Sequence, residues 1–254
     1  MTGDSTRRFS NRVENYVKYR PGYPTAVVEY LREACGLTAP AVIADVGSGT
    51  GILSELFLKN GNPVFAVEPN DDMRQAAEVR LGHYPNFTSV AGTAEATSLP
   101  DTSVDFVTAG QAFHWFDAPR ARVEFARILQ PDGFVALVWN RQKVEATPFM
   151  RGYKALIDTY SLDYNVVKHS REGVDEDIAL LFDGRMQVHF FPNEQRFDFE
   201  GLHGRLLSSS YAPLPDHANY QPMVAELRRL FESHRQNGEI IFKYETRLYL
   251  GKVS

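Results

Sequence analysis

The amino-acid sequence predicts an α/β fold built on a doubly wound, mostly parallel sheet. Short apolar runs alternate with amphipathic stretches between residues 41 and 140, and such alternation is typical of strands joined by helices. A glycine-rich turn follows the first apolar run, and an acid ends the second. A closed eight-unit barrel needs more repeats than this stretch contains. We therefore expect ligands to bind at the carboxyl ends of parallel strands.

The composition indicates a domain that folds without covalent or metal supports. The chain has 254 residues, of which 43% are hydrophobic, an ordinary share for a globular protein. Cys35 is the single cysteine, so it forms no intramolecular disulfide, and no cysteine and histidine pairs stand at zinc-ligand spacing. We expect a reducing, cytoplasmic location and no bound metal.

The charge and hydropathy patterns favour a small molecule as the partner. The formal net charge is −5 and the sequence has no long Lys/Arg block, which argues against a nucleic-acid binder. The N-terminal residues lack a continuous apolar signal core, and no apolar run is long enough to span a bilayer. We expect a soluble monomer or homodimer without a membrane or nucleic-acid partner.

The elements follow in order from the N-terminus. Residues 1–38 are expected to form a helical cap in two pieces, separated by the proline- and glycine-containing YRPGYP. The ligand-binding core follows over residues 41–140. Its helices are predicted over ILSELFLKNG, over MRQAAEVRLG with Asn70 as N-cap, and over APRARVEFARIL. Its strands are predicted over AVIADVGSG, PVFAVEP, FTSVAG, VDFVTAG and FVALVWN.

The alternation stops after the fifth strand. Residues 144–185 are predicted to be a helical insertion without strands, and residues 199–238 a second insertion, both over the substrate site. The alternating patterns of MQVHFFP and of residues 239–253 predict two more strands, of which the last is antiparallel. The seven strands would complete a Rossmann-like sheet in a single domain that spans residues 1–254.

The segment DVGSGTG, Asp45 to Gly51, carries the strongest chemical signal. Its glycines let a ligand approach the backbone, and the helix that follows begins with free N–H groups and a positive dipole end. Glu68 ends the next strand, where a carboxylate can accept both hydrogens of a ribose diol. The two motifs together predict a site for a ligand that contains a ribose.

The turn has two other interpretations. A nicotinamide dinucleotide site needs glycine, or sometimes alanine, at position 52, where this chain has Ile52. That spacing disfavours a pyrophosphate at the helix start. A glycine-rich turn can also simply connect a strand to a helix without binding a ligand, but the acid at the end of the second strand argues for a ligand.

Three segments carry a family resemblance: VIADVGSGTGILSELFLKNGNPVFAVEPNDDMRQAA, GTAEATSLPDTSVDFVTAGQAFHW and EFARILQPDGFVALVWN. In this order and register they resemble class I S-adenosylmethionine-dependent methyltransferases, over roughly residues 9–140. The chain is more narrowly similar to the small-molecule branch that includes trans-aconitate and quinone-biosynthesis methyltransferases. The resemblance implies S-adenosyl-L-methionine as cofactor and a small-molecule substrate.

The resemblance implies a role for several residues of the two motifs. Glu68 is expected to bind the ribose hydroxyls. Asp45 is expected either to pair with the amino end of the cofactor or to bond the backbone of the turn. Met73 is placed near adenine or in the core. The methionine part of the cofactor is expected to pack against Gly47, Ser48, Gly49 and Gly51.

The loop after the third strand matches the adenine-contacting loop of the family. Relatives commonly have aspartate where this chain has Thr93, which puts the usual carboxylate contact in doubt. Thr93 can accept one hydrogen bond, and the Ala94 N–H can meet a ring nitrogen. Glu95 either supplies the missing charge or faces solvent. Gln111, just beyond the fourth strand, is expected to face both cofactor and substrate.

The segment GQAFHWF is expected to line the methyl-transfer cavity, because aromatic faces suit a cationic sulfonium. Trp115 is a candidate substrate contact. His114 either acts as a general base or packs in an aromatic wall, with packing favoured.

Residues outside the core are further candidates for the substrate side. The segment YVKYRPGYP resembles a part that relatives fold over the cofactor. Tyr16 and Tyr19 either close the pocket or pack on the core, and Arg20 either binds a carboxylate or faces solvent. In the second insertion, the residues that either reach the cavity or pack beneath it are His203, Arg205 and Tyr211.

The predicted function is methyl transfer from S-adenosylmethionine to a small acceptor, acidic or phenolic, by in-line displacement. A fold does not guarantee an activity, so a regulatory or interaction protein that binds the cofactor without transferring a methyl group is the alternative. A nicotinamide-dependent oxidoreductase is the third interpretation.

Overall fold

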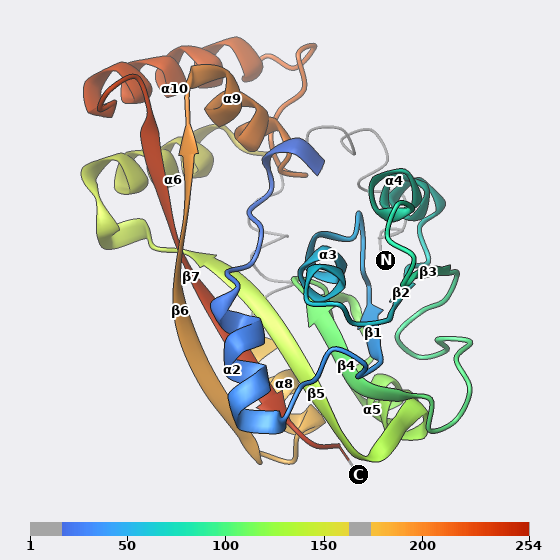
Figure 1. The fold of residues 1–254 in the computed structure, drawn as a ribbon. Helices are drawn as coiled ribbons and strands as arrows, with labels where there is room; N and C mark the ends of the chain where they lie inside the picture. The colour runs from blue at the N-terminus through green and yellow to red at the C-terminus, as the bar shows by residue number, and fades with distance from the viewer. Residues whose placement is uncertain (1–16, 163–173, 254) are drawn as a thin grey trace.

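The computed structural model describes residues 17–162 and 174–253 of the chain. Seven strands in this part form one sheet in the order β3-β2-β1-β4-β5-β7-β6 (Figure 1). Pairing is parallel from β3 through to β5, whereas β7 is antiparallel to both β5 and β6. The predicted mostly parallel seven-stranded sheet with an antiparallel C-terminal strand is confirmed. The strands are β1 (Ile43–Val46), β2 (Val64–Val67), β3 (Phe87–Val90), β4 (Val104–Gly110), β5 (Leu129–Gln142), β6 (Met186–Phe197) and β7 (Ile240–Gly251).

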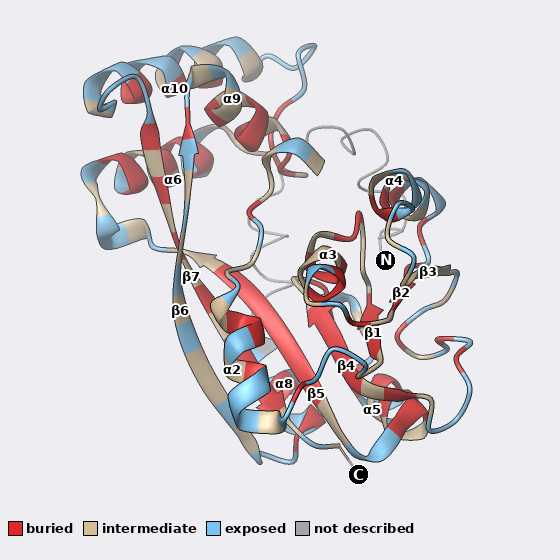
Figure 2. Cartoon of the chain, viewed as in Figure 1, coloured by how far each residue is buried: buried red, intermediate tan, exposed pale blue. Residues whose placement is uncertain are grey.

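Helices cover both faces of the sheet, and the central strands between them are buried (Figure 2). In β1, Ile43 belongs to one apolar cluster and Ala44 and Val46 to the other, because successive side chains of a strand point to opposite faces. The first cluster is completed by α2 (Ala26–Cys35), α3 (Ile52–Lys59) and α4 (Asp71–Leu81), and the second by α5 (Ala118–Ile128) and α8 (Val174–Leu181).

Strands β6 and β7 continue past the C-terminal end of β5 as a two-stranded ribbon. Residue pairing between β6 and β7 extends to Phe197 opposite Ile240, whereas β5 reaches only Tyr244. Three helices surround the ribbon (Figure 1), and the buried Phe242 ring packs at their centre, 4.9 Å from the Tyr153 ring. We name this part the upper layer. Its helices are α6 (Pro148–Tyr160), α9 (Phe199–Leu207) and α10 (Tyr220–His234).

The predicted insertions divide between two places. In the described part of residues 144–185, α6 joins the upper layer, but α8 packs on the sheet beside α5. Residues 199–238 supply α9 and α10 of the upper layer. In the predicted N-terminal cap, α2 packs on the sheet rather than above it. No helix of the described ranges combines the length and the apolar composition that a membrane crossing needs.

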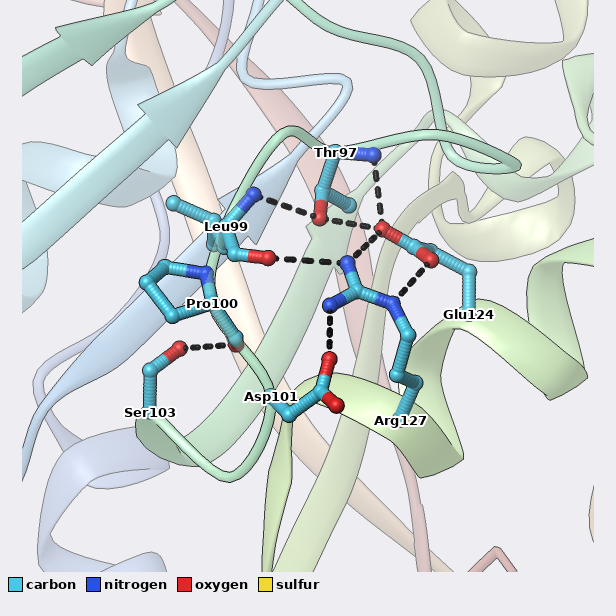
Figure 3. Close-up of polar contacts among 7 residues, drawn as sticks. All are labelled: Thr97, Leu99, Pro100, Asp101, Ser103, Glu124 and Arg127. Carbon is cyan, nitrogen blue, oxygen red and sulfur yellow. Dashed lines mark hydrogen bonds and ion pairs between the residues drawn. The ribbon is translucent and has the colours of Figure 1, made fainter.

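A polar cluster ties the loop after β3 to α5 (Figure 3). The Arg127 guanidinium donates to both Glu124 oxygens and to the Leu99 carbonyl, and it pairs with Asp101. The Thr97 N–H donates to the buried Glu124 carboxylate at 2.8 Å. These interactions lower the pKa of Glu124 to about 2, chiefly through the hydrogen bonds from Arg127. The cluster therefore anchors the chain just beyond the predicted adenine loop.

Candidate functional site

A cavity of about 850 Å³ opens at the carboxyl ends of the parallel strands and extends to the upper layer. This is the edge of the sheet at which doubly wound folds bind their ligands. Most of the residues predicted for the site line this cavity: Arg20, Asp45, Gly47, Ser48, Gly49, Glu68, Met73, Thr93, Ala94, Glu95, Gln111, His114, Trp115 and Tyr211.

The glycine turn leads from β1 into α3 and shapes one wall. Gly49 has a φ of +56°, and a Cβ built on it would meet no atom within 4 Å, so the backbone there is open to a ligand. Gly51 has a different role and does not line the cavity. A Cβ at Gly51 would lie 2.3 Å from Leu81 Cδ1, so this glycine lets α3 and α4 pack closely.

Two buried hydroxyls of the turn have no hydrogen-bond partner among the described residues. The Ser48 Oγ and the Thr50 Oγ1 are both buried, and neither makes a hydrogen bond to a described residue. Both residues line the cavity. Since buried polar atoms nearly always have hydrogen-bond partners, the two hydroxyls fit a ligand with polar groups.

Glu68 connects the end of β2 to the glycine turn. Its Oε2 accepts the Gly49 N–H at 2.8 Å, and its Oε1 accepts the Asn70 N–H at 2.9 Å. Burial raises the pKa of Glu68, while the two N–H groups and Arg74 oppose the rise. A carboxylate has about four acceptor sites, so the two oxygens retain capacity for the ribose diol.

Asp45 is fully buried in β1 and lies in register with Thr108 of β4. Its Oδ2 accepts from the Ser54 hydroxyl at 2.6 Å, and its Oδ1 accepts from the Thr108 hydroxyl at 3.2 Å. Burial raises the pKa of Asp45 to about 7, although both hydroxyls favour the charged form. A cationic ligand group beside this carboxylate would offset the cost of its burial.

The predicted adenine side combines residues of α4 and of the loop after β3. Met73 is buried, and its N–H donates to the Asn70 side chain at 3.0 Å, which starts α4 at the predicted N-cap. Thr93 forms a backbone bridge with Ala96, which gives the loop its tight shape. The Glu95 carboxylate accepts the Asp117 N–H at 2.9 Å, so it is held toward the start of α5.

Gln111 and Asn140 join the ends of β4 and β5. The Gln111 Oε1 accepts the Asn140 N–H at 3.0 Å, and its Nε2 donates to the Asn140 carbonyl at 3.3 Å. Gln111 itself has a φ of +58°, an uncommon conformation for a residue with a side chain. The amide thus continues the ladder between the two strands, and the short 3₁₀ turn η3 (Phe113–Trp115) follows directly.

The aromatic residues of η3 form a further wall of the cavity. The His114 ring lies 4.7 Å from the Trp115 ring and 6.5 Å from the Trp139 ring, measured between centroids. Phe116 packs under the glycine turn, where a Cβ at Gly47 would approach its ring to 3.2 Å. His114 is therefore placed both for packing and for contact with a ligand.

The candidate site residues near the N-terminus differ in whether they line the cavity. Tyr16 lies outside the described residues. Tyr19 does not line the cavity; its ring packs on α9, where a Cβ at Gly204 would lie only 2.0 Å from it. Arg20 does line the cavity, and its Nη2 donates to the Ser208 carbonyl at 2.8 Å. Tyr23 lines it as well.

The second insertion also contributes to the cavity. Arg205 and Tyr211 line it, whereas His203 packs against Phe199 and bonds the Tyr220 hydroxyl at 3.2 Å. Sequence reasoning missed Tyr23, Trp139, Asn140 and Tyr244. Asn140 could have been identified from the sequence, because it is the polar residue that ends the buried run FVALVWN.

The fold and the cavity define a Rossmann-like α/β domain with a ligand cavity at the carboxyl ends of its parallel strands. Comparison with known proteins extends this assignment. Residues 44–137, from β1 into β5, match the family model of the methyltransferase domain. The chain therefore carries a class I S-adenosylmethionine-dependent methyltransferase domain, as its sequence predicts, and S-adenosylmethionine is the cofactor of this class. The open backbone at Gly49, the Ser48 and Thr50 hydroxyls and the acceptor capacity of Glu68 fit that cofactor.

The similarity extends to curated relatives. An uncharacterized methyltransferase of Mycobacterium tuberculosis is 38% identical over 137 residues, which are 54% of this chain and 54% of the relative. The match thus spans about half the length of that protein. An uncharacterized methyltransferase of Schizosaccharomyces pombe is 28% identical over 208 residues, which cover 80% of this chain and 78% of the relative.

Solved structures share the fold at low sequence identity. A protein described as a type II methyltransferase from Anaeromyxobacter dehalogenans superposes with a TM-score of 0.63 at 22% identity, over 92% of this chain and 98% of its own. A protein described as a methyltransferase from an antibiotic biosynthesis pathway of Anabaena variabilis superposes with a TM-score of 0.59 over the same shares, also at 22% identity.

Proposed function

We propose that the protein transfers a methyl group from S-adenosylmethionine to a small-molecule acceptor. The observation that carries this proposal is the extent of the cavity, which reaches from the glycine turn and Glu68 to Arg205 and Tyr211 of the upper layer. Its volume of about 850 Å³ lies in the upper part of the roughly 300–1,000 Å³ range of ligand pockets. The cavity therefore has room for a cofactor and a second small molecule.

When bound, S-adenosylmethionine would supply an electrophilic methyl group, and the electrons of the carbon–sulfur bond would stay on sulfur as the acceptor takes the methyl group. The protein contributes mainly alignment, which places reacting atoms about 3–3.5 Å apart. Glu68 holds the turn and would hold the ribose. Trp115 and Phe116 present aromatic surface that suits a cation and excludes water.

The acceptor must either be ionised when it binds or release a proton to a base. His114 lines the cavity and is the histidine that sequence reasoning selected for this role. Gln111 and Asn140 fix the start of the η3 turn on which His114 lies. His114 would accept the proton only if the acceptor is a phenol, an amine or an acidic carbon.

Turnover separates a methyltransferase from a protein that only binds the cofactor. Purified protein is incubated with methyl-labelled S-adenosylmethionine and a metabolite extract that has been passed through a size filter. A labelled product of low molecular mass supports the proposal. Saturable binding of S-adenosylhomocysteine without any labelled product would instead favour the regulatory alternative. We further propose a cytoplasmic location, which the single cysteine supports.

A further inference from the structure

Arg205, on α9, is a buried cation in the upper layer. Only 3% of its surface is exposed, and its partners within the described ranges are all neutral. Its Nε donates to the Tyr244 hydroxyl at 3.0 Å, and its Nη1 donates to the Ser209 hydroxyl at 3.3 Å. The guanidinium carbon also lies 5.4 Å from the centre of the Phe242 ring. No described carboxylate forms an ion pair with it.

Such an arrangement leaves a positive charge uncompensated. Burying an ion is costly unless an opposite charge or a full set of hydrogen bonds replaces water. Tyr244 cannot supply the charge, because its hydroxyl donates its own proton to Gln195 Oε1 at 2.9 Å and so acts as a neutral acceptor. The Arg205 Nη2 makes no hydrogen bond to a described residue, although Arg205 lines the cavity.

A second guanidinium stands near the same phenols. The positive charges of Arg20 and Arg205 both oppose the rise that burial causes in the pKa of Tyr153 and of Tyr244. The Tyr153 hydroxyl is fully buried and has no hydrogen-bond partner among the described residues. Arg20 donates to the Ser208 carbonyl at 2.8 Å and Arg205 to the Ser209 hydroxyl at 3.3 Å, so the two cations bind adjacent residues at the end of α9.

The acids of the cavity wall do not neutralise Arg205. Asp45 and Glu68 bind hydroxyls and N–H groups around the glycine turn, and Asp175 pairs with Arg141 at 2.8 Å. The acids Asp45 and Glu68 therefore lie at the predicted cofactor site, whereas Arg20 and Arg205 lie beside the upper layer. This arrangement suits the cofactor's ammonium group at one end of the cavity and an anionic second ligand at the other end.

We propose that Arg205 forms an anion-binding subsite for the methyl acceptor, and that the acceptor carries a carboxylate or another oxyanion. This inference rests on the proposed function, because it assigns the class of acceptor that the same cavity takes. A guanidinium matches the planar geometry of a carboxylate and donates charge-assisted hydrogen bonds to it. Arg20 strengthens the positive potential at this subsite. Tyr244 positions Arg205, because its hydroxyl accepts a hydrogen bond from the Arg205 Nε.

The test measures binding, so that it does not depend on which acceptor atom is methylated. Protein saturated with S-adenosylhomocysteine is titrated by calorimetry with aliphatic and aromatic carboxylates, with their matching primary amides, and with inorganic phosphate. We expect at least one carboxylate to bind at least about tenfold more tightly than its amide. Tighter binding of phosphate than of every carboxylate would identify a phosphate-bearing acceptor, which is the other source of the same chemistry and also supports the subsite.

Substitutions test whether Arg205 is the residue that binds the carboxylate. Arg205→Gln should weaken carboxylate binding about tenfold or more, whereas Arg205→Lys should retain part of it because the charge remains. Tyr244→Phe removes a positioning contact and should weaken binding by a smaller factor, in case Arg205→Gln fails to fold. Arg229→Gln is the control: this arginine is paired with Glu226 on the exposed side of α10 and should leave anion binding unchanged.

The outcomes separate the two proposals. Equal binding of acids and amides, absence of any anion binding, or unchanged carboxylate affinity in folded Arg205→Gln would overturn the subsite. Each of these results leaves the proposed function intact, provided that S-adenosylhomocysteine still binds. Failure of the wild-type protein to bind S-adenosylhomocysteine would overturn the proposed function instead, and anion binding to the protein alone would then still test Arg205.

Discussion

The Glu68 carboxylate accepts the Gly49 N–H at 2.8 Å, so the acid that ends β2 holds the glycine turn that follows β1. Parallel pairing of β1 and β2 brings the two strand ends together. The turn and the acid are therefore one structural unit, in which the same carboxylate shapes the backbone and faces the cavity.

Replacing Glu68 should weaken cofactor binding. Glu68→Ala removes the acceptor for the Gly49 and Asn70 N–H groups and for the ribose, and the loss of two charge-assisted hydrogen bonds to a ligand corresponds to about 3 kcal/mol, or roughly 100-fold in Kd. Calorimetry with S-adenosylhomocysteine measures this. Asp71→Ala removes a mostly exposed acid nearby and should change little; an equal loss in both variants would show that the effect is general electrostatics.

A pair of variants at Gly49 separates backbone strain from occupation of the cavity. Both Gly49→Ala and Gly49→Arg place a side chain at a φ of +56°, which costs about 1 kcal/mol of stability in each. Only arginine is long enough to fill the space where a ligand approaches the backbone. We expect similar melting temperatures but loss of S-adenosylhomocysteine binding in Gly49→Arg alone. Equal affinities of the two variants would place the ligand elsewhere.

The sequence predicts the parallel core well because its signals are local. The continuous burial of β1 and the Asn70 cap of α4 follow from neighbouring residues. The substrate side depends on contacts between distant segments. Arg205 meets Tyr244 across 39 positions, and the Tyr19 ring packs on Gly204 of α9, which is far away in the sequence. No periodicity encodes such pairings.

The raised pKa of Asp45 should make stability fall as pH rises. The carboxyl has a pKa of about 7 in the folded chain and about 3.9 when unfolded, so between these values the folded state binds more protons. Its contribution therefore declines from about pH 4 to pH 7, by at most about 4 kcal/mol. Urea unfolding at pH 5 and pH 8 should show this decline, and Asp45→Asn should reduce it.

Proton release on binding distinguishes the two predicted roles of Asp45. If the carboxylate pairs with the cofactor's ammonium, binding lowers its pKa and expels a proton near pH 6. The calorimetric enthalpy of S-adenosylhomocysteine binding would then depend on the ionisation enthalpy of the buffer, and Asp45→Asn would remove that dependence. A buffer-independent enthalpy at pH 6 in the wild-type protein would assign Asp45 to the Ser54 and Thr108 hydrogen bonds alone.

Glu124 should stabilise the fold above acidic pH. Its folded pKa of about 2 lies below the unfolded value near 4.3, so its contribution is complete above about pH 5 and is lost as pH falls toward 2. We expect Glu124→Gln to lower the free energy of unfolding by about 2 kcal/mol at pH 7 and by much less near pH 2.5. Asp101→Asn, at the exposed end of the same cluster, should cost less than about 1 kcal/mol; a larger loss there than at Glu124 contradicts the assignment.

The role of His114 can be decided by replacing its imidazole with an aromatic ring that cannot accept a proton. His114→Phe keeps an aromatic surface beside Trp115 and Trp139 but cannot accept a proton, whereas His114→Ala removes both properties. A general base typically contributes about 10²- to 10⁴-fold. If packing is its role, as we expect, His114→Phe retains turnover within about fivefold of wild type between pH 6 and pH 9, and His114→Ala loses more because the wall opens. A fall of 100-fold or more in both variants, with loss of the acidic limb of the wild-type pH profile and unchanged S-adenosylhomocysteine affinity, would establish proton transfer.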